Sequence, residues 1–121
     1  MIEVVAARLN QGSEALRAMW ELLTDAERRR ALRLRFERDR RRFVVARARL
    51  RELLAERLGA QPQALELVSG PGGKPALAPK LAASGWRFNL SHCDELAVYA
   101  FSRGRELGID LEAIRPVGEA D

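Results

Sequence analysis

The sequence is poor in the residue types that build disulfides and transition-metal sites. It contains one cysteine, Cys93, and one histidine, His92, among 121 residues. A lone cysteine excludes a disulfide within the chain, and the two residues together are too few for a zinc site. The lack of disulfides is typical of a reducing compartment, so we expect an intracellular, cytoplasmic protein.

Long apolar runs are also missing. No run approaches the roughly 20 residues of a membrane-spanning helix, and the first residues lack the charged-then-apolar pattern of a secretory signal. Hydrophobic residues nevertheless make up 47% of the chain and charged residues 31%, which is typical of a globular protein. We therefore expect one folded domain, or one lobe of something larger, with no membrane partner.

Acidic residues are outnumbered two to one in the part of the chain where arginine is abundant. Between Thr24 and Leu58 there are 13 basic and 6 acidic residues, an excess of seven positive charges. All of these cations are arginine, whose guanidinium forms bidentate contacts to phosphate. The excess predicts an anionic partner. A merely solvated helix face is the alternative, and so is a nucleic-acid-binding module, although aromatic residues do not punctuate the basic stretch.

Apolar periodicity and turn signals predict helices in the first half. The expected elements are a strand over Ile2–Leu9 and helices over Glu14–Leu23, from the Thr24–Glu27 capping box to about Phe36, and over Asp39–Leu58. Gly59 is positioned to end the last helix. Arg40, Arg47 and Arg51 are spaced by seven and four residues, which predicts one stripe facing away from the apolar side.

The second half predicts short strands joined by loops. Strands are expected over Leu65–Val68, Trp86–Leu90, Leu96–Phe101 and Leu107–Leu111, loops over Ser69–Gly73 and Pro79–Gly85, and a turn over Ser102–Arg105. Residues 113–121 show no period and indicate a tail or linker. The fold class is therefore predicted to be α+β, with a small, mostly antiparallel sheet packed against two to three helices.

Two carboxylates stand two residues apart in the last predicted strand. Asp110 and Glu112 share one face there, with Cα atoms roughly 7 Å apart. Oxygen ligands of this kind suit Mg²⁺, although a solvated face is the ordinary alternative. Asn89, Ser91 and His92 end a neighbouring predicted strand and add an amide, a hydroxyl and an imidazole, which favours a phosphate-bearing ligand.

Three short motifs resemble the 4'-phosphopantetheinyl transferases. FNLSH at 88–92 and GIDLE at 108–112 resemble the two N-terminal signature motifs of the long, surfactin-synthetase-activating type. GKP at 73–75 resembles the element that precedes them in that family. Order and approximate spacing agree, and the similarity extends more loosely back to about Leu22.

This resemblance implies an enzyme that transfers 4'-phosphopantetheine from coenzyme A to a serine of an acyl or peptidyl carrier protein, releasing adenosine 3',5'-bisphosphate. It implies that Asp110 and Glu112 bind Mg²⁺. It also implies that basic and polar side chains bind coenzyme A, namely Lys74, Ser91, His92, Arg28, Arg42 and Arg47. The fold implied is one lobe of a pseudo-two-fold, two-lobe transferase, with residues 1–112 as the N-terminal lobe and 113–121 as a tail or the start of a linker.

The family's third motif, a Trp/Phe-x-x-Lys-Glu-x-x-x-Lys helix, has no counterpart after Glu112. We therefore expect the chain to be a fragment, inactive or nearly so alone, and assign it no catalytic residue. Apolar surface left uncovered should favour self-association. A natural short form that dimerises is one alternative, and a non-catalytic lobe that binds carrier proteins is another.

Overall fold

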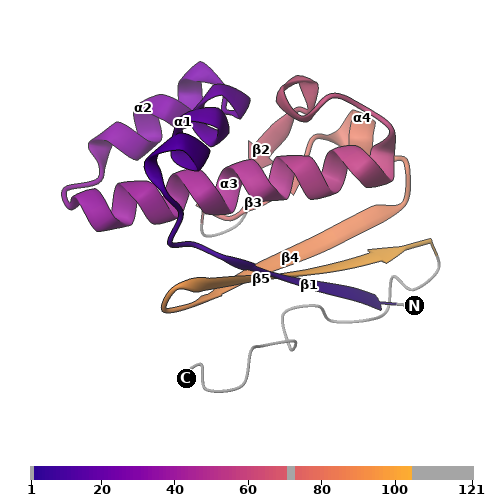
Figure 1. Ribbon diagram of the computed structural model, residues 1–121. Coiled ribbons are helices and arrows are strands. Elements are labelled where there is room, and N and C mark those ends of the chain that lie inside the picture. Colours follow the sequence, from indigo (N-terminus) through magenta and orange to yellow (C-terminus); the bar gives the residue numbers. More distant parts are fainter. Residues whose placement is uncertain (1, 71–72, 105–121) are drawn as a thin grey trace. The chain divides into compact units, whose positions relative to one another are not determined.

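The computed structural model describes residues 2–70 and 73–104 (Figure 1). The elements in chain order are β1 (Ile2–Arg8), α1 (Ser13–Leu22), α2 (Asp25–Arg33), α3 (Glu37–Leu58), the 3-10 helix η1 (Pro62–Ala64), β2 (Leu67–Ser69), β3 (Pro75–Leu77), α4 (Pro79–Ala82), β4 (Trp86–Cys93) and β5 (Leu96–Arg103). Helices and small antiparallel sheets confirm the predicted α+β class. Among the described residues, no helix combines the length and apolar character needed to cross a membrane.

The chain forms two compact units. The sheet unit comprises, among the described residues, 2–6, 66–70, 73–94 and 98–104, and the helical unit comprises Ala7–Leu65 with Glu95–Ala97. Each unit has its own pattern of burial and hydrogen bonding.

The sheet unit is organised around β5. The strand order is β1-β5-β4, so β5 is central (Figure 1). A two-residue turn joins β4 to β5 and makes them an antiparallel hairpin, with Asp94 at a φ of 52°, in the left-handed region that such turns use. Tyr99 and Phe101 are fully buried, and the Phe101 ring lies 6.5 Å from the rings of both Tyr99 and Phe88. These aromatic rings form the apolar centre of the hairpin.

Several boundaries in the sheet unit differ from the sequence predictions. β4 runs to Cys93 rather than ending at Leu90, so Ser91 and His92 lie within the strand. β5 runs through Ser102, which is buried, to Arg103, so the chain leaves the strand at Gly104 rather than at Ser102. The predicted loop over Pro79–Gly85 contains a short helix, α4, with proline at its first position, where the missing N–H costs nothing. The strand expected over Leu65–Val68 is β2, which begins two residues later, at Leu67, because Leu65 caps η1 and its N–H donates to the Pro62 carbonyl (3.4 Å).

A second, two-stranded sheet pairs β2 with β3. The pairing is antiparallel, with Leu67 opposite Leu77 and Ser69 opposite Pro75. The predicted strand over Leu107–Leu111, the pair Asp110 and Glu112, and the tail 113–121 lie outside the described residues.

Local signals set the boundaries in the helical unit. The predicted capping box is confirmed: the Thr24 hydroxyl accepts from the Glu27 N–H (3.3 Å), and the Thr24 N–H donates to Glu27 Oε1 (3.0 Å). α2 ends at Arg33, not near Phe36, because Leu34 adopts an extended conformation. Gly59 ends α3 with a φ of 65°, as predicted, and its N–H donates to the Ala55 carbonyl (2.8 Å).

The long helix α3 supplies most of the buried side chains of the helical unit. Its fully buried apolar residues are Val45, Ala48, Leu50 and Leu54. Burial of a leucine side chain stabilises the folded state by about 1.5–3 kcal/mol, so Leu50 and Leu54 anchor the middle of the helix. α1 contributes Met19, and Leu23 follows it, both buried.

Candidate phosphate-binding site

A buried ionic network holds α2 to α3. The Glu27 carboxylate accepts hydrogen bonds from Arg51 Nε (2.8 Å) and Nη2 (2.9 Å) and from Arg47 Nη1 (3.0 Å). Arg51 also donates through Nη1 to the carbonyls of Pro62 (2.8 Å) and Leu65 (2.7 Å). Glu27 is 6% exposed and Arg51 2%, so water does not replace these contacts. One carboxylate and two guanidiniums therefore join α2, α3 and the segment Pro62–Leu65 that contains η1.

The pKa values of the groups in this network reflect two opposing influences, burial and hydrogen bonding. Burial, the largest influence, would alone raise the pKa of Glu27, but the hydrogen bonds from Arg51, from the Thr24 backbone and from Arg47 outweigh it and lower the pKa below its ordinary value. Burial is also the largest influence on Arg47 and lowers the pKa of its guanidinium, opposed by the hydrogen bond to Glu27. Arginine still carries its charge at accessible pH, so the network is ionic.

The predicted surface stripe of Arg40, Arg47 and Arg51 is wrong. Arg47 is 8% exposed and lies over the Phe43 ring, 5.0 Å from its centroid, while Arg51 is almost fully buried. Arg40 folds back on the connection before α3, where it donates to the Leu34 carbonyl (2.7 Å). Helical periodicity placed these arginines outside because it carries no information about an acidic partner 20 or 24 residues away.

Arg28 is likewise held by its own neighbourhood. Its Nε donates to the Trp20 carbonyl (3.1 Å), its Nη2 to the Glu21 carbonyl (3.3 Å), and its Nη1 to Asp25 (3.2 Å). The guanidinium lies 5.8 Å from the Trp20 ring centroid. These contacts fix the connection between α1 and α2. For both Arg28 and Arg47, binding of coenzyme A stays a prediction.

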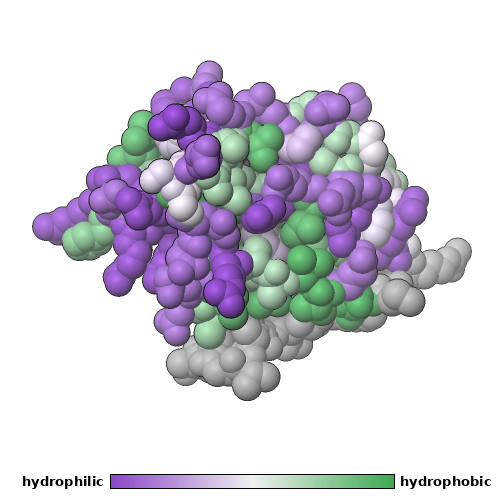
Figure 2. All heavy atoms as spheres, in the orientation of Figure 1, coloured by the Kyte–Doolittle hydropathy of each residue, from purple (hydrophilic) through white to green (hydrophobic). Residues whose placement is uncertain are grey.

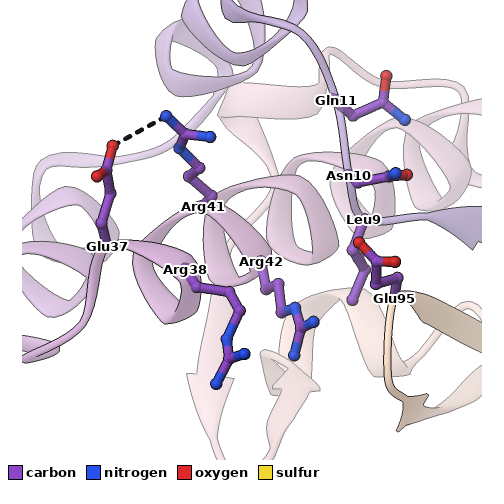
Figure 3. A pocket seen from close by; sticks show the side chains of 8 residues that line it. All are labelled: Leu9, Asn10, Gln11, Glu37, Arg38, Arg41, Arg42 and Glu95. Atoms are coloured by element: carbon purple, nitrogen blue, oxygen red, sulfur yellow. Dashed lines mark hydrogen bonds and ion pairs between the residues drawn. The ribbon is translucent and has the colours of Figure 1, made fainter.

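Arg42 lines an open pocket within the helical unit (Figure 3). The pocket has a volume of about 280 Å³ and is lined by residues from the end of β1, the first turns of α3 and the β4–β5 turn: Leu9, Asn10, Gln11, Glu37, Arg38, Arg41, Arg42 and Glu95. The Leu9 N–H donates to the Glu95 carbonyl (2.6 Å), which fixes two of these segments to each other. A small ligand could enter such a concave, polar site.

Two of the three arginines in the pocket have no protein partner among the described residues. Arg41 pairs with Glu37 (2.9 Å), as the dashed line in Figure 3 shows. Arg38 and Arg42 have no ion pair or hydrogen bond within the described part of the chain, and their side chains extend to the same side of α3 (Figure 3). Positions four apart on a helix are neighbours, so these guanidiniums can together bind a phosphate or another anion.

The sequence prediction for Arg42 was that it binds coenzyme A, which stays a prediction, and the other residues that line this pocket were not singled out as site residues. The spacing of Arg38 and Arg42 is visible in the sequence and would have marked them as a pair. Asn10, Gln11 and Glu95 carry no such signal, because they reach the pocket only through the pairing of the β1 end with a turn some 85 residues later.

The other predicted coenzyme A ligands lie in the sheet unit. Ser91 and His92 are neighbours in β4, so their side chains point to opposite faces of the strand, with Ser91 half-buried and His92 exposed. Lys74 is exposed just before β3, and its carbonyl accepts from the Gly70 N–H (2.6 Å). Their binding of coenzyme A stays a prediction.

Magnesium binding by Asp110 and Glu112 also stays a prediction, because both lie outside the described residues. Within residues 2–70 and 73–104, no group of three or more His, Cys, Asp or Glu side chains is arranged to hold a metal ion.

The fold and the arginine-lined pocket define an α+β protein with a site suited to anions. Comparison with known proteins assigns the chain to a family. Residues 10–103 match the family model of the 4'-phosphopantetheinyl transferase N-terminal region. The chain is 38% identical over 113 residues to the 4'-phosphopantetheinyl transferase HetI of Nostoc sp., covering 93% of this chain and 48% of HetI. It is 43% identical over 67 residues to the 4'-phosphopantetheinyl transferase AcpT of Escherichia coli, covering 54% of this chain and 31% of AcpT.

A solved structure shares the fold. The holo-(acyl-carrier-protein) synthase from Bacillus anthracis, in complex with CoA (3',5'-ADP), matches with a TM-score of 0.61 and 25% identity, covering 83% of this chain and 91% of that one. The chain belongs to the 4'-phosphopantetheinyl transferase family, as its three motifs predicted. It spans about half of HetI and about a third of AcpT.

Proposed function

We propose that this chain provides the coenzyme A-binding N-terminal lobe, residues 1–112, of an enzyme that transfers 4'-phosphopantetheine to a serine of an acyl or peptidyl carrier protein. The observation that carries the proposal is the family match over residues 10–103. The names of HetI and AcpT and the carrier-protein synthase structure support the same reaction class.

The arginine-lined pocket supports a phosphate-rich substrate. Arg38 and Arg42 present two guanidinium groups that can contact one anion, and bidentate guanidinium contacts suit phosphate oxygens. The Bacillus anthracis relative was solved with CoA (3',5'-ADP), which carries phosphate groups of this kind. In the proposed role, Arg38 and Arg42 bind phosphates of coenzyme A, with Lys74, Ser91 and His92 as further candidate donors.

The proposed reaction is a phosphoryl-group displacement. The serine oxygen of the carrier protein bonds to the β-phosphorus of coenzyme A and loses its proton, while the bond from that phosphorus to the adenosine 3',5'-bisphosphate oxygen breaks. Positioning of the two substrates and neutralisation of charge on the phosphate oxygens account for catalysis of this type. Arg38 and Arg42 contribute to the second of these by holding cationic charge beside the phosphates.

The proposal includes magnesium dependence, which is argued only from the chemistry of two carboxylate side chains. Asp110 and Glu112 are the candidate ligands, since Mg²⁺ prefers carboxylate oxygens. When bound, the ion would supply Lewis-acid stabilisation of phosphate charge.

Calorimetric titration of the chain with coenzyme A, with and without Mg²⁺, tests this function. We expect binding that strengthens with Mg²⁺, and a loss of roughly tenfold or more in affinity for Arg42→Ala, because a hydrogen bond to a charged group contributes about 1.5–3 kcal/mol. Arg17→Ala is the matched control, since Arg17 is exposed on α1 and does not line the pocket. Absence of any coenzyme A binding by the unaltered chain would refute the proposal.

A nucleic-acid-binding module is the second candidate, supported by nine arginines against two acidic residues between Arg28 and Arg42. Titration with duplex DNA at two salt concentrations distinguishes it. Steeply salt-dependent DNA binding without a coenzyme A response would favour this candidate. Binding of carrier protein without coenzyme A would instead favour a non-catalytic lobe.

A further inference from the structure

The arginine-lined pocket also contains a carboxylate without a partner. Glu95, at the β4–β5 turn, lines the pocket, and its side chain forms no hydrogen bond or ion pair within the described part of the chain. The other carboxylate in the lining, Glu37, is paired with Arg41 (2.9 Å). In Figure 3, the side chains of Arg38 and Arg42 come from α3, and that of Glu95 comes from the turn. Unpaired charges of both signs therefore line one pocket.

The backbone holds Glu95 at the pocket independently of its side chain. The Glu95 carbonyl accepts from the Leu9 N–H (2.6 Å), which ties the turn to the end of β1. The side chain itself is exposed at the mouth of the open pocket. Its substitution should therefore change the chemistry of the pocket and leave the turn in place.

The charges in the pocket argue against a simple anion as its preferred ligand. A phosphate monoester carries about 1.5–2 negative charges at neutral pH, and Arg38 and Arg42 supply the opposite charge. Glu95 would face such an anion as a like charge, which disfavours binding. A donor group beside the phosphate removes this conflict, because an ionised carboxylate accepts hydrogen bonds. The pocket therefore suits a phosphate monoester with a neighbouring hydroxyl or amino group.

The size and polarity of the pocket restrict it to one polar part of a larger ligand. Its volume of about 280 Å³ lies just below the roughly 300–1,000 Å³ of sites that enclose a whole small molecule. Figure 2 shows hydrophilic residues predominating over the first turns of α3. In coenzyme A, the 3'-phosphate stands beside the ribose 2'-hydroxyl, which is the combination that this pocket suits. Carboxylates accept hydrogen bonds from ribose hydroxyls in other nucleotide-binding proteins.

We propose that Glu95 is a specificity-determining residue that accepts a hydrogen bond from the ribose 2'-hydroxyl of a nucleotide whose 3'-phosphate is bound by Arg38 and Arg42. The inference rests on the proposed function. It goes further by giving a carboxylate that the transfer reaction does not use a role in the selection of the ligand.

Two ligands that differ by one hydroxyl test the proposal: adenosine 3',5'-bisphosphate and its 2'-deoxy analogue. Calorimetry measures the affinity of the unaltered chain, Glu95→Ala and Glu95→Gln for both ligands and for coenzyme A. Asp94→Asn is the matched control, since Asp94 is exposed in the same turn, does not line the pocket, and has a positive φ that asparagine tolerates. Thermal unfolding verifies that every variant is folded.

We expect the unaltered chain to bind adenosine 3',5'-bisphosphate about tenfold more tightly than the 2'-deoxy analogue, as one hydrogen bond to a charged group provides. In Glu95→Ala this ratio should fall to about one, because the hydroxyl has lost its acceptor. Affinity for the 2'-deoxy analogue should be unchanged or higher in this variant, since the like charge is gone. Glu95→Gln should give an intermediate ratio, and Asp94→Asn should keep the ratio of the unaltered chain.

A ratio that Glu95→Ala leaves unchanged, or an unaltered chain that binds both bisphosphates equally, would overturn the role of Glu95. Equal loss of affinity for the two ligands in Glu95→Ala would overturn it as well, because a structural role predicts that result. With coenzyme A still bound, either outcome leaves the proposed function standing. Failure of the unaltered chain to bind coenzyme A would instead remove the proposed function, and this inference with it.

Discussion

Substitution of Glu27 by alanine removes the only carboxylate in contact with Arg47 and Arg51 among the described residues. Both guanidiniums then stay buried without a countercharge, and the capping box loses its acceptor for the Thr24 N–H. The alternative, in which the arginines turn outward to water, would break the hydrogen bonds that join α2 to α3.

Removal of one partner from a buried ion pair costs about 3–5 kcal/mol, because the remaining charge is left desolvated. This is a large fraction of the roughly 5–15 kcal/mol that stabilises a domain. For a chain of this size, it corresponds to a fall in melting temperature on the order of 10–25 °C. Glu27→Gln keeps one acceptor oxygen but loses the charge, so its effect should lie between those of alanine and the native residue.

Urea unfolding followed by circular dichroism measures this cost. The matched control is Glu52→Gln, which removes an ion pair to Arg49 of similar length (2.9 Å) between two partly exposed side chains. Exposed pairs contribute about 0–1 kcal/mol, so the control should unfold almost as the native chain does. A loss below about 1 kcal/mol for Glu27→Ala would show that the buried network does not stabilise the helical unit.

Three further predictions concern acid, a helix end and the carboxylate pair. The pKa of Glu27 is lowered on folding, so its contribution to stability is complete above its ordinary value of 4.5 and is lost as pH falls below it. The free energy of unfolding should therefore decrease on acidification below this value, and less steeply in Glu27→Gln than in the native chain. Equal pH slopes for the two proteins in urea titrations would contradict this assignment. Gly59→Ala should cost about 1 kcal/mol by urea unfolding, through backbone strain alone, because φ is 65° and an added Cβ meets no atom within 4 Å. An unchanged free energy of unfolding would contradict this account of Gly59. Asp110→Ala should abolish the effect of Mg²⁺ on coenzyme A binding while leaving the melting temperature within a few degrees, and a variant whose calorimetric response to Mg²⁺ is intact would exclude Asp110 as a ligand.

Elements with local signals were predictable from the sequence. The Thr24–Glu27 capping box and Gly59 specify helix ends through contacts within four residues, and both are confirmed. The alternation over Leu96–Phe101 likewise identified β5, although the strand continues two residues further. In each case, the information needed to predict the element lies within the element or next to it.

Features that depend on distant residues were not predictable. The composition and spacing of Arg47 and Arg51 are typical of surface residues. Their burial is explained only by the ion pairs that both form with Glu27, which is distant in the sequence. The pocket shows the same limit: the family resemblance pointed to Arg42, but Asn10 and Glu95 join it through tertiary pairing. Leu32 and Phe36 have the helical spacing of a core face and are instead exposed.

The contacts of Arg51 with two different segments affect how the helical unit unfolds. Its guanidinium contacts the carboxylate of α2 and two carbonyls after α3, so separation of either segment leaves charged N–H groups without acceptors in an apolar interior. Fraying of one segment therefore weakens the attachment of the other, and intermediates with only one of them detached are disfavoured. The unit should lose its structure as a single cooperative block rather than helix by helix.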